Sequence, residues 1–384
     1  MNALVSRSAF CLLAVMLSAA LAGCAPPPPS VIKIGVAQPL SGELAALGQD
    51  LLNGVKLAVD ELNAEGFQVD GRRVTLEVVA VDDKADAETG RAVARQLVNA
   101  GVVAVIGHLN SGVSIAAAPI YAEKHIPQLS ISTHPRYTEL GYSTVFRLVA
   151  NDTLQSRAMG RYAAEHFQGN RFAVLDDGTP YGKDLAAGAA AQLRSANKNI
   201  VLAQSFDDKT RDFDAVAARL KSAGVESVVT TLSDFQVAAL LEALQKVQYN
   251  QLQILGGDTI KSSLLPKSPA LVRGKLFATS AILEPTEFLN GKAFMARYRE
   301  KYRIEVAYGA HYTFDAMHQL AAAIHRAKSA DPAGIAVALR QVDSHVPITG
   351  YMKWDARGEQ TYGAVAVYKI RESAWESQVR SETW

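Results

Sequence analysis

Residues 31–37 read VIKIGVA, a short and almost wholly apolar run that is typical of a buried β-strand. Residues 48–65 follow it and carry a broad face of apolar side chains at helical spacing. Strand-like and helix-like segments keep alternating to about residue 255. Strictly alternating strands and helices form parallel sheets with helices on both faces. The sequence therefore predicts an α/β fold.

The alternation runs through the chain twice. We expect further strands at 74–81, 102–106, 128–131, 172–175, 200–204, 227–231 and 251–255. We expect further helices at 85–100, 114–125, 155–167, 182–195, 213–223 and 236–245. The pattern restarts with a helix near residue 155, and the chain is too long for one comfortable core. Two similar, doubly wound parallel-sheet lobes are therefore predicted.

The tail of the chain departs from this order. We expect a strand at 277–281, helices at 288–302 and 308–327, and antiparallel edge strands at 350–355 and 363–370 around a turn at 356–358. The chain would then return to the first lobe and finish on the second, which makes a hinge of three crossings. The predicted bounds are 31–148 with 281–347 for the first lobe, and 149–280 with 348–384 for the second.

The N-terminus has the features of an export signal. Arg7 precedes an apolar run at 9–22 that is short for a membrane span, and small residues follow. The stretch Leu21-Ala22-Gly23-Cys24 resembles the lipobox of bacterial lipoproteins, which implies cleavage after residue 23 and lipidation of Cys24. Residues 24–30 contain four consecutive prolines and are expected to form a stiff tether. The alternative is an ordinary cleaved signal peptide with an incidental cysteine.

Composition excludes several functions. Without residues 1–23 the chain has 38 basic residues, one fewer than the 39 of the full sequence, against 38 acidic ones, so nothing favours nucleic acid as a partner. Of the two cysteines, Cys11 leaves with the signal and Cys24 is the expected lipid site. The folded body then has no thiol for a disulfide, a nucleophile or a cysteine-ligated zinc ion.

Motifs along the whole mature chain occur in the order of one known family. They are Ile34-Gly35-Val36-Ala37-Gln38-Pro39-Leu40-Ser41-Gly42, residues 54–66, Val81-Asp82-Asp83, Val105-Ile106-Gly107-His108-Leu109, Tyr181-Gly182, Tyr312-Thr313-Phe314-Asp315-Ala316 and Trp354-Asp355 with Gly358. The chain resembles the leucine/isoleucine/valine-type periplasmic binding proteins of ABC transporters, which have the type I periplasmic binding protein fold. This resemblance implies a monomer without cofactor, a small ligand between the lobes, often an amino acid, and an ABC permease as partner.

The resemblance also implies ligand contacts on the first lobe. Ser111 and Gly112 precede the helix expected at 114–125, where free N–H groups and the helix dipole suit a carboxylate. The alternative is that Ser111 only caps that helix. A second contact loop corresponds to 130–133, where Ser132 and Thr133 are candidates. This loop is one residue shorter than the usual pattern, and Thr133 is preferred. The alternative is that Thr133 only caps the turn before Pro135.

On the second lobe the resemblance points to Tyr181, Ser233 and Asp258. Tyr181 would close an aromatic ring over the ligand, or would only pack at a helix start. Asp258 would face the ligand ammonium, or would cap a solvated turn. Ser233 stands where many relatives have an aromatic residue, and Phe235 is an alternative that would reach the cleft in its place. Asn110 and His134 replace residues that are commonly small, so a polar ligand, an aromatic ligand and a ligand other than an amino acid all stay open.

Other chemistry is not supported by the motifs. Residues 178–184 lack the spacing of a phosphate-binding loop, and the pairs Asp176-Asp177 and Asp207-Asp208 are expected to be solvated rather than to bind a metal. Histidines at 311, 318 and 325 have no partners at ligand spacing and predict a surface or packing stripe. The prediction is a lipid-anchored solute-binding protein, not an enzyme, on the periplasmic face of a bacterial membrane. The alternative is a sensor or regulator with the same fold, and which membrane holds the anchor stays open.

Overall fold

A computed structural model of the chain describes residues 30–262, 264–271, 275–372 and 374–384. The predicted signal peptide, Cys24 and the tether up to residue 29 lie outside the described residues. None of the described helices combines the length and the apolar character that a membrane crossing requires.

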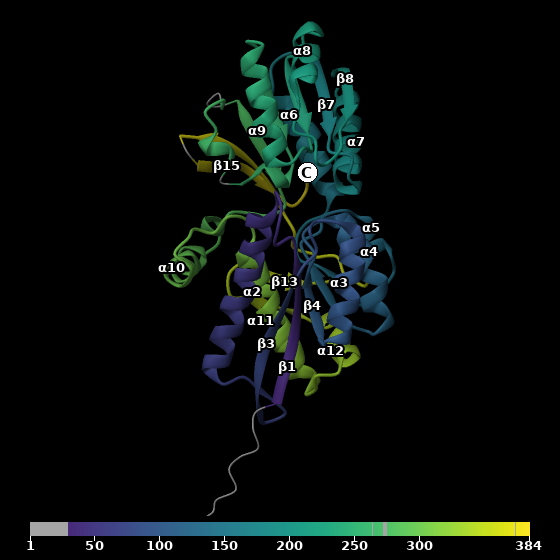
Figure 1. Ribbon diagram of the computed structural model, residues 1–384, viewed down its shortest axis with the longest axis vertical. Coiled ribbons are helices and arrows are strands. Elements are labelled where there is room, and N and C mark those ends of the chain that lie inside the picture. The colour runs from purple at the N-terminus through teal and green to yellow at the C-terminus, as the bar shows by residue number, and fades with distance from the viewer. Residues whose placement is uncertain (1–29, 263, 272–274, 373) are drawn as a thin grey trace, which may run out of the picture. The chain divides into compact units, whose positions relative to one another are not determined.

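A six-stranded sheet, which defines the first lobe, has the order β2-β3-β1-β4-β5-β6 (Figure 1). Its strands are β1 (Ser30–Gln38), β2 (Gln68–Val69), β3 (Arg72–Asp82), β4 (Ala104–Gly107), β5 (Gln128–Ser130) and β6 (Val145–Arg147). The VIKIGVA run lies inside β1, which pairs in parallel with β4, with Ile34 opposite Ala104. Strand β6, a short segment that the sequence pattern did not predict, pairs in parallel with β5 and completes the sheet.

Helices cover both faces of this sheet because successive side chains of a strand point to opposite sides. Ile34 and Val36 pack with helices α2 (Ala45–Glu65) and α11 (Ala310–Ala327), whereas Ala37 packs with α3 (Ala87–Asn99) and α4 (Ser111–Glu123). Figure 1 shows the two pairs of helices on either side of β1, β3 and β4. Helix α12 (Pro332–Arg340) packs beside α11, and the short helix α5 (Arg136–Glu139) follows β5.

A seven-stranded sheet defines the second lobe and has the order β15-β14-β11-β10-β9-β7-β8. Its strands are β7 (Arg171–Asp176), β8 (Asn199–Ser205), β9 (Ser227–Thr230), β10 (Gln253–Gly256), β11 (Leu276–Ser280), β14 (Val365–Arg371) and β15 (Ala374–Ser381). Helices α6 (Asp152–His166) and α7 (Pro180–Ser195) cover one face, and α8 (Asp214–Ser222) and α9 (Asp234–Lys246) cover the other. The predicted two-sheet α/β architecture is confirmed.

The chain passes between the two sheets three times. It leaves the first sheet after β6, returns after β11 to form α11 and α12, and leaves again before β14. The stretch between β11 and α11 contains one 3-10 turn (Pro285–Glu287) and helix α10 (Gly291–Tyr302). This helix begins three residues later than predicted, because Phe288 ends a 3-10 turn and Gly291 packs so closely on Pro285 that no side chain fits there.

The C-terminal strands pair differently from the prediction. Strand β13 (Gly350–Lys353) forms a separate antiparallel pair with β12 (Asp343–Val346), whereas β14 pairs antiparallel with β11 and with the unpredicted strand β15. The expected hairpin around 356–358 is therefore wrong, apart from an isolated bridge between Trp354 and Gln360. The predicted change of lobe at residue 348 falls in the turn between β12 and β13, and the lobe bounds stay a prediction.

Candidate functional site

A pocket of about 640 Å³ lies between the loops that follow the strands of the two sheets. Loops at the carboxyl ends of parallel strands are where α/β proteins bind ligands. Of the seven predicted contact residues, six line this pocket: Ser111, Gly112, Thr133, Tyr181, Ser233 and Asp258. The tertiary structure thus brings together positions that are up to 147 residues apart in the sequence (258 − 111).

The first turn of helix α4 opens onto the pocket. Ser111 and Gly112 are its first two residues, and the side chain of the N-cap residue, Asn110, makes no capping hydrogen bond. The N–H groups of Val113 and Ser114 donate to the carbonyl of Asn110, but those of Ser111 and Gly112 find no acceptor among the described residues. Free N–H groups and the positive end of the helix dipole make this turn suitable for an anionic group such as a carboxylate.

The two candidates in the loop after β5 have different environments. Thr133 is buried and lines the pocket, whereas Ser132 turns away from it. The Ser132 hydroxyl lies 2.6 Å from that of Ser114 and accepts a hydrogen bond from that of Ser130 at 2.9 Å. The Ser132 hydroxyl ties the loop to α4 and Ser132 is not among the residues that line the pocket, so its contact with the ligand stays a prediction. Thr133, the preferred candidate from the sequence, is the one of the two that lines the pocket.

Tyr181 and Asp258 are joined on the second lobe. Tyr181 lies in the first turn of α7, and its hydroxyl accepts the backbone N–H of Asp258 at 3.0 Å. Burial, and then the nearby carboxylate of Asp258, raise the pKa of Tyr181 well above its ordinary value, so the phenol stays neutral. A side chain at Gly257 would come within 2.3 Å of the Tyr181 hydroxyl oxygen, so a larger residue there would displace the Tyr181 side chain.

Asp258 has one carboxylate oxygen in use and one without a partner. Its Oδ1 accepts the N–H of Ala281 at 2.7 Å, while its buried Oδ2 has no hydrogen-bond partner among the described residues. Burial raises the pKa of Asp258. An unpaired buried carboxylate is costly, and a cation at this position would relieve that cost. The capping alternative for Asp258 would therefore account for Oδ1 but not for the buried Oδ2.

Sequence reasoning missed a second buried carboxylate. Asp152 starts α6 and is buried, and neither of its oxygens has a partner within the described part of the chain. Burial and the neighbouring charge of Asp258 raise its pKa well above the ordinary value. Its only signal in the sequence is its place after the N-cap Asn151, which reads as an ordinary acidic residue in a first helical turn. Only the fold places it near Asp258.

Tyr308 is a second missed wall residue, and Asp50 holds it in place. Tyr308 lines the pocket just before α11. The carboxylate of Asp50, buried on α2, accepts the backbone N–H groups of residues 307–310 at 2.8 to 3.1 Å. Asp50 therefore caps the start of α11 from another helix, and this bond network fixes the segment that carries Tyr308.

The remaining candidates do not all reach the pocket. Ser233 lines it and also forms a capping box with Gln236 at the start of α9, so its capping role is structural. Phe235 is not a lining residue, and its ring lies 5.1 Å from the Arg211 guanidinium carbon. His134 lies beside the pocket and forms a contact with Asp184 of the second lobe at 2.8 Å.

Acidic side chains dominate the charged part of the pocket wall. The carboxylates are those of Asp86, Asp177, Asp207, Asp208 and Asp258, and the one amine is that of Lys183. Asp207 and Asp208 line the pocket but are exposed, as predicted. Asp177 is buried, which differs from the expectation for its pair, and burial raises the pKa of Asp177 to about 6. No cluster of three or more histidine, cysteine or acidic residues that would suit a metal occurs among the described residues.

Comparisons with known proteins agree with this architecture. A family model described as periplasmic binding protein matches residues 31–374, and the chain belongs to this family. Leu/Ile/Val-binding protein homolog 2 of Brucella abortus (strain 2308) is 32% identical over 343 residues, which cover 88% of this chain and 90% of that protein. The leucine-, isoleucine-, valine-, threonine-, and alanine-binding protein of Pseudomonas aeruginosa is 27% identical over 350 residues, or 91% of this chain and 92% of that one.

Solved structures confirm the type I periplasmic binding protein fold. The branched-chain amino acid transporter substrate binding protein LivJ of Streptococcus pneumoniae, in complex with isoleucine, matches with a TM-score of 0.81 and 25% identity over 91% of this chain and 99% of that one. A solute binding protein of Rhodopseudomonas palustris in complex with 3,4-dihydroxy benzoic acid matches with a TM-score of 0.79 and 19% identity, over 91% and 97% of the chains. The second likeness concerns the fold alone. Membership of a family of binding proteins is consistent with the expectation that the chain is not an enzyme.

Proposed function

We propose that this protein binds an α-amino acid in the pocket between its lobes and delivers it to an ABC importer. The observation that carries the proposal is a pairing of opposite polarities across one pocket. Helix α4 presents uncapped N–H groups at Ser111 and Gly112, while Asp258 presents an unpaired carboxylate oxygen. An α-amino acid has a carboxylate for the first and an ammonium for the second.

The mechanism is closure around the ligand. Ser111, Gly112 and Thr133 belong to the first lobe, and Tyr181 and Asp258 belong to the second. A ligand that contacts both lobes gains all of its contacts only when the lobes are together, so binding shifts the population to the closed form. A permease that recognises the closed form would then accept only loaded protein. The amino-acid binding of the Brucella and Pseudomonas relatives, as their names state it, supports this ligand class.

Attachment to a membrane belongs to the same proposal. The Leu21-Ala22-Gly23-Cys24 stretch supports lipidation of Cys24, and the proline tether would hold a monomeric body near the periplasmic face of the membrane. Mass spectrometry of the mature protein tests this step. We expect a diacylated and N-acylated Cys24 at the N-terminus, and a Cys24→Ser variant released from the membrane. An unmodified cysteine would overturn the anchor and leave the ligand proposal intact.

The ligand proposal is tested by calorimetry with a panel that separates the two ends of an amino acid. We expect leucine, isoleucine or another α-amino acid to bind, and 4-methylpentanoate, which lacks the amino group of leucine, to bind far more weakly. Asp258→Asn should lose amino-acid affinity by about 2–5 kcal/mol, the usual cost of removing one partner of a buried charge pair. Asp315→Asn is a matched control, because Asp315 is buried outside the pocket and accepts the N–H groups of Ile348 and Thr349.

Two results would contradict the ligand proposal. One is equal affinity of wild type and Asp258→Asn for every amino acid that binds. The other is binding of benzoate-type acids with no binding of any amino acid. That result would keep the α4 N–H groups as a carboxylate site and would rule out Asp258 as an ammonium site.

A further inference from the structure

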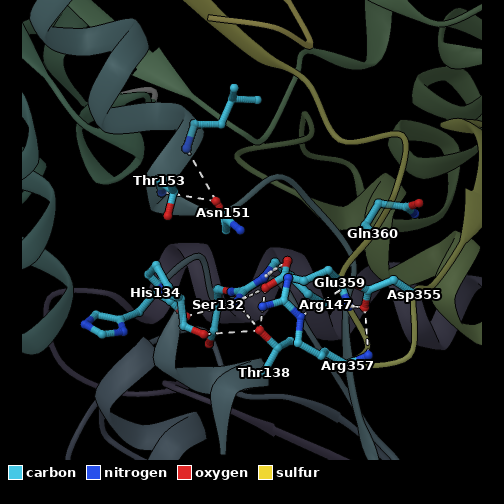
Figure 2. A network of polar contacts seen from close by, with 12 residues as sticks. Ser132, His134, Thr138, Arg147, Asn151, Thr153, Asp355, Arg357, Glu359 and Gln360 are labelled. Carbon is cyan, nitrogen blue, oxygen red and sulfur yellow. Dashed lines mark hydrogen bonds and ion pairs between the residues drawn. The ribbon is translucent and has the colours of Figure 1, made fainter.

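Arg147 is a fully buried charged side chain beside the loops that form the pocket. It ends strand β6, where the chain leaves the first sheet, and its side chain is fully buried. Its Nε and Nη2 donate to the two carboxylate oxygens of Glu359, at 2.9 and 3.0 Å (Figure 2). A bidentate pair of this kind fixes the plane of the guanidinium as well as its position.

The other donors of Arg147 hold the 131–134 loop, which carries Thr133. Nη1 donates to the carbonyl of Ser132, and Nη2 donates to the carbonyl of His134 at 3.0 Å (Figure 2). The carbonyl between them, that of Thr133, accepts the backbone N–H of Asp152 at 2.8 Å. Three consecutive carbonyls are thus fixed, so the peptide planes of the loop cannot turn independently and Thr133 keeps its place in the pocket wall.

Glu359 anchors this arrangement from the third crossing between the lobes. The Thr138 hydroxyl also donates to Glu359, and the backbone N–H of Arg147 donates to the carbonyl of Gly358 at 2.8 Å. Burial alone would raise the pKa of Glu359, but the hydrogen bonds and charge of Arg147 lower it below its ordinary value, so the carboxylate stays ionised. The segment that joins β13 to β14 is therefore bonded to the same strand end that holds the loop.

We propose that Arg147 and Glu359 are positioning residues for ligand binding: Glu359 orients the Arg147 guanidinium, and Arg147 sets the backbone of the 131–134 loop at the pocket. The pair does not itself line the pocket, so it acts through Thr133. The identity of the ligand rests on the proposed function, whereas the fixing of the loop does not.

The first test is leucine binding, measured by calorimetry well below the unfolding transition. Arg147→Lys keeps the charge but its single nitrogen cannot hold two carbonyls and a carboxylate in the same geometry. Glu359→Gln keeps the shape and removes the charge that orients Arg147. We expect each variant to raise the Kd for leucine by about tenfold or more, the lower end of the effects seen when groups that orient metal ligands are removed.

Tyr137→Phe is the matched control. Tyr137 is also fully buried, its ring lies 5.6 Å from the Arg147 guanidinium carbon, and its hydroxyl donates to the carbonyl of Gln128 at 2.8 Å. Removal of this hydroxyl should lower stability without changing any contact of the 131–134 loop. Its Kd should therefore equal that of the wild type, which separates positioning of the loop from a general loss of stability.

The second test needs no ligand: hydrogen exchange of the amides of residues 131–134. We expect faster exchange in Arg147→Lys and Glu359→Gln, and wild-type exchange in Tyr137→Phe. Unchanged exchange in both pair variants, or an unchanged Kd in both, would overturn the positioning role. A wild-type protein that binds no amino acid would overturn the proposed function instead. The exchange rates would still show whether Arg147 and Glu359 restrain the 131–134 loop.

Discussion

The imidazole of His134 and the carboxylate of Asp184 meet across the two lobes, with 2.8 Å between Nε2 and Oδ2. The Nδ1 atom of His134 accepts the N–H of Arg136 at 3.1 Å, so Nε2 is the atom that donates to Asp184. Helix α7, which carries Asp184, also brings Pro180 against Gly112 of helix α4. One side of the pocket is therefore closed by direct contact between the lobes, and the His134–Asp184 bond belongs to that contact.

Loss of the Asp184 carboxylate should favour the open form slightly. Because the side chain is 66% exposed, the bond contributes no more than about 1 kcal/mol. Asp184→Ala should therefore raise the Kd for the ligand by about fivefold at most, and should increase the radius of gyration of the ligand-free protein in solution scattering. Asp214→Ala is the control, because it removes an exposed ion pair with Lys246 inside one lobe. Identical scattering and affinity for the two variants would show that the contact has no part in closure.

Ligand binding should release protons. Burial raises the pKa values of both Asp258 and Asp152 in the ligand-free protein, so these groups hold protons at a higher pH than ordinary aspartates. An ammonium beside Asp258 favours the ionised form and lowers its pKa on binding. Affinity should therefore rise with pH through the raised pKa of the free protein and level off above it. Calorimetry in buffers of different ionisation enthalpy measures the released protons, and an enthalpy independent of the buffer throughout this range would contradict the prediction.

Asp50 should contribute more to the free energy of unfolding than an ordinary helix N-cap does. Its buried carboxylate accepts the N–H groups of residues 307–310, so Asp50→Ala leaves several buried donors unpaired and should lower the free energy of unfolding by about 2–4 kcal/mol. Asp331→Ala removes an exposed cap that accepts only the N–H of Gly334, and should cost about 1 kcal/mol. Urea unfolding measures both. Equal losses would mean that capping from another helix adds nothing.

Gly257 should tolerate no side chain without loss of binding. A methyl group there would meet the Tyr181 hydroxyl at 2.3 Å and displace the ring from the bond it makes with Asp258. Gly257→Ala should therefore raise the ligand Kd by about tenfold or more, the effect of about 1.4 kcal/mol. Gly334→Ala is the control, because its nearest neighbour would lie at 3.5 Å and alanine favours the helix. Wild-type affinity in Gly257→Ala would remove Tyr181 from the binding site.

Local patterns predicted much of the fold and the pocket. The VIKIGVA run became the central strand β1 because a continuous apolar strand is stable only when both of its faces are covered. Ser111, Gly112, Thr133, Tyr181, Ser233 and Asp258 were found because loops after parallel strands meet at one edge of a sheet, and the family resemblance supplied which loops to choose.

Other features had no signal in the sequence. The pairing of β13 with β12 was missed because the local sequence of a short amphipathic strand does not indicate which other strand it pairs with. Ser132 and Thr133 are neighbours with chemically similar side chains. Only the fold shows that the Ser132 hydroxyl contacts that of Ser114, whereas Thr133 lines the pocket.

The sequence by itself determined the alternation of strands and helices, the family, and the loops that would form the pocket, because these follow from periodicity and short motifs. The tertiary structure alone decided which buried charges meet. Asp152 comes to lie near Asp258, Asp50 caps a helix that starts 260 residues later, and Arg147 is joined to Glu359 across 212 residues. These neighbours depend on the path of the chain through three crossings. Asp50 and Arg147 gain hydrogen-bond partners in this way. Asp152 and Asp258 are two carboxylates brought close together, which raises the pKa of Asp152.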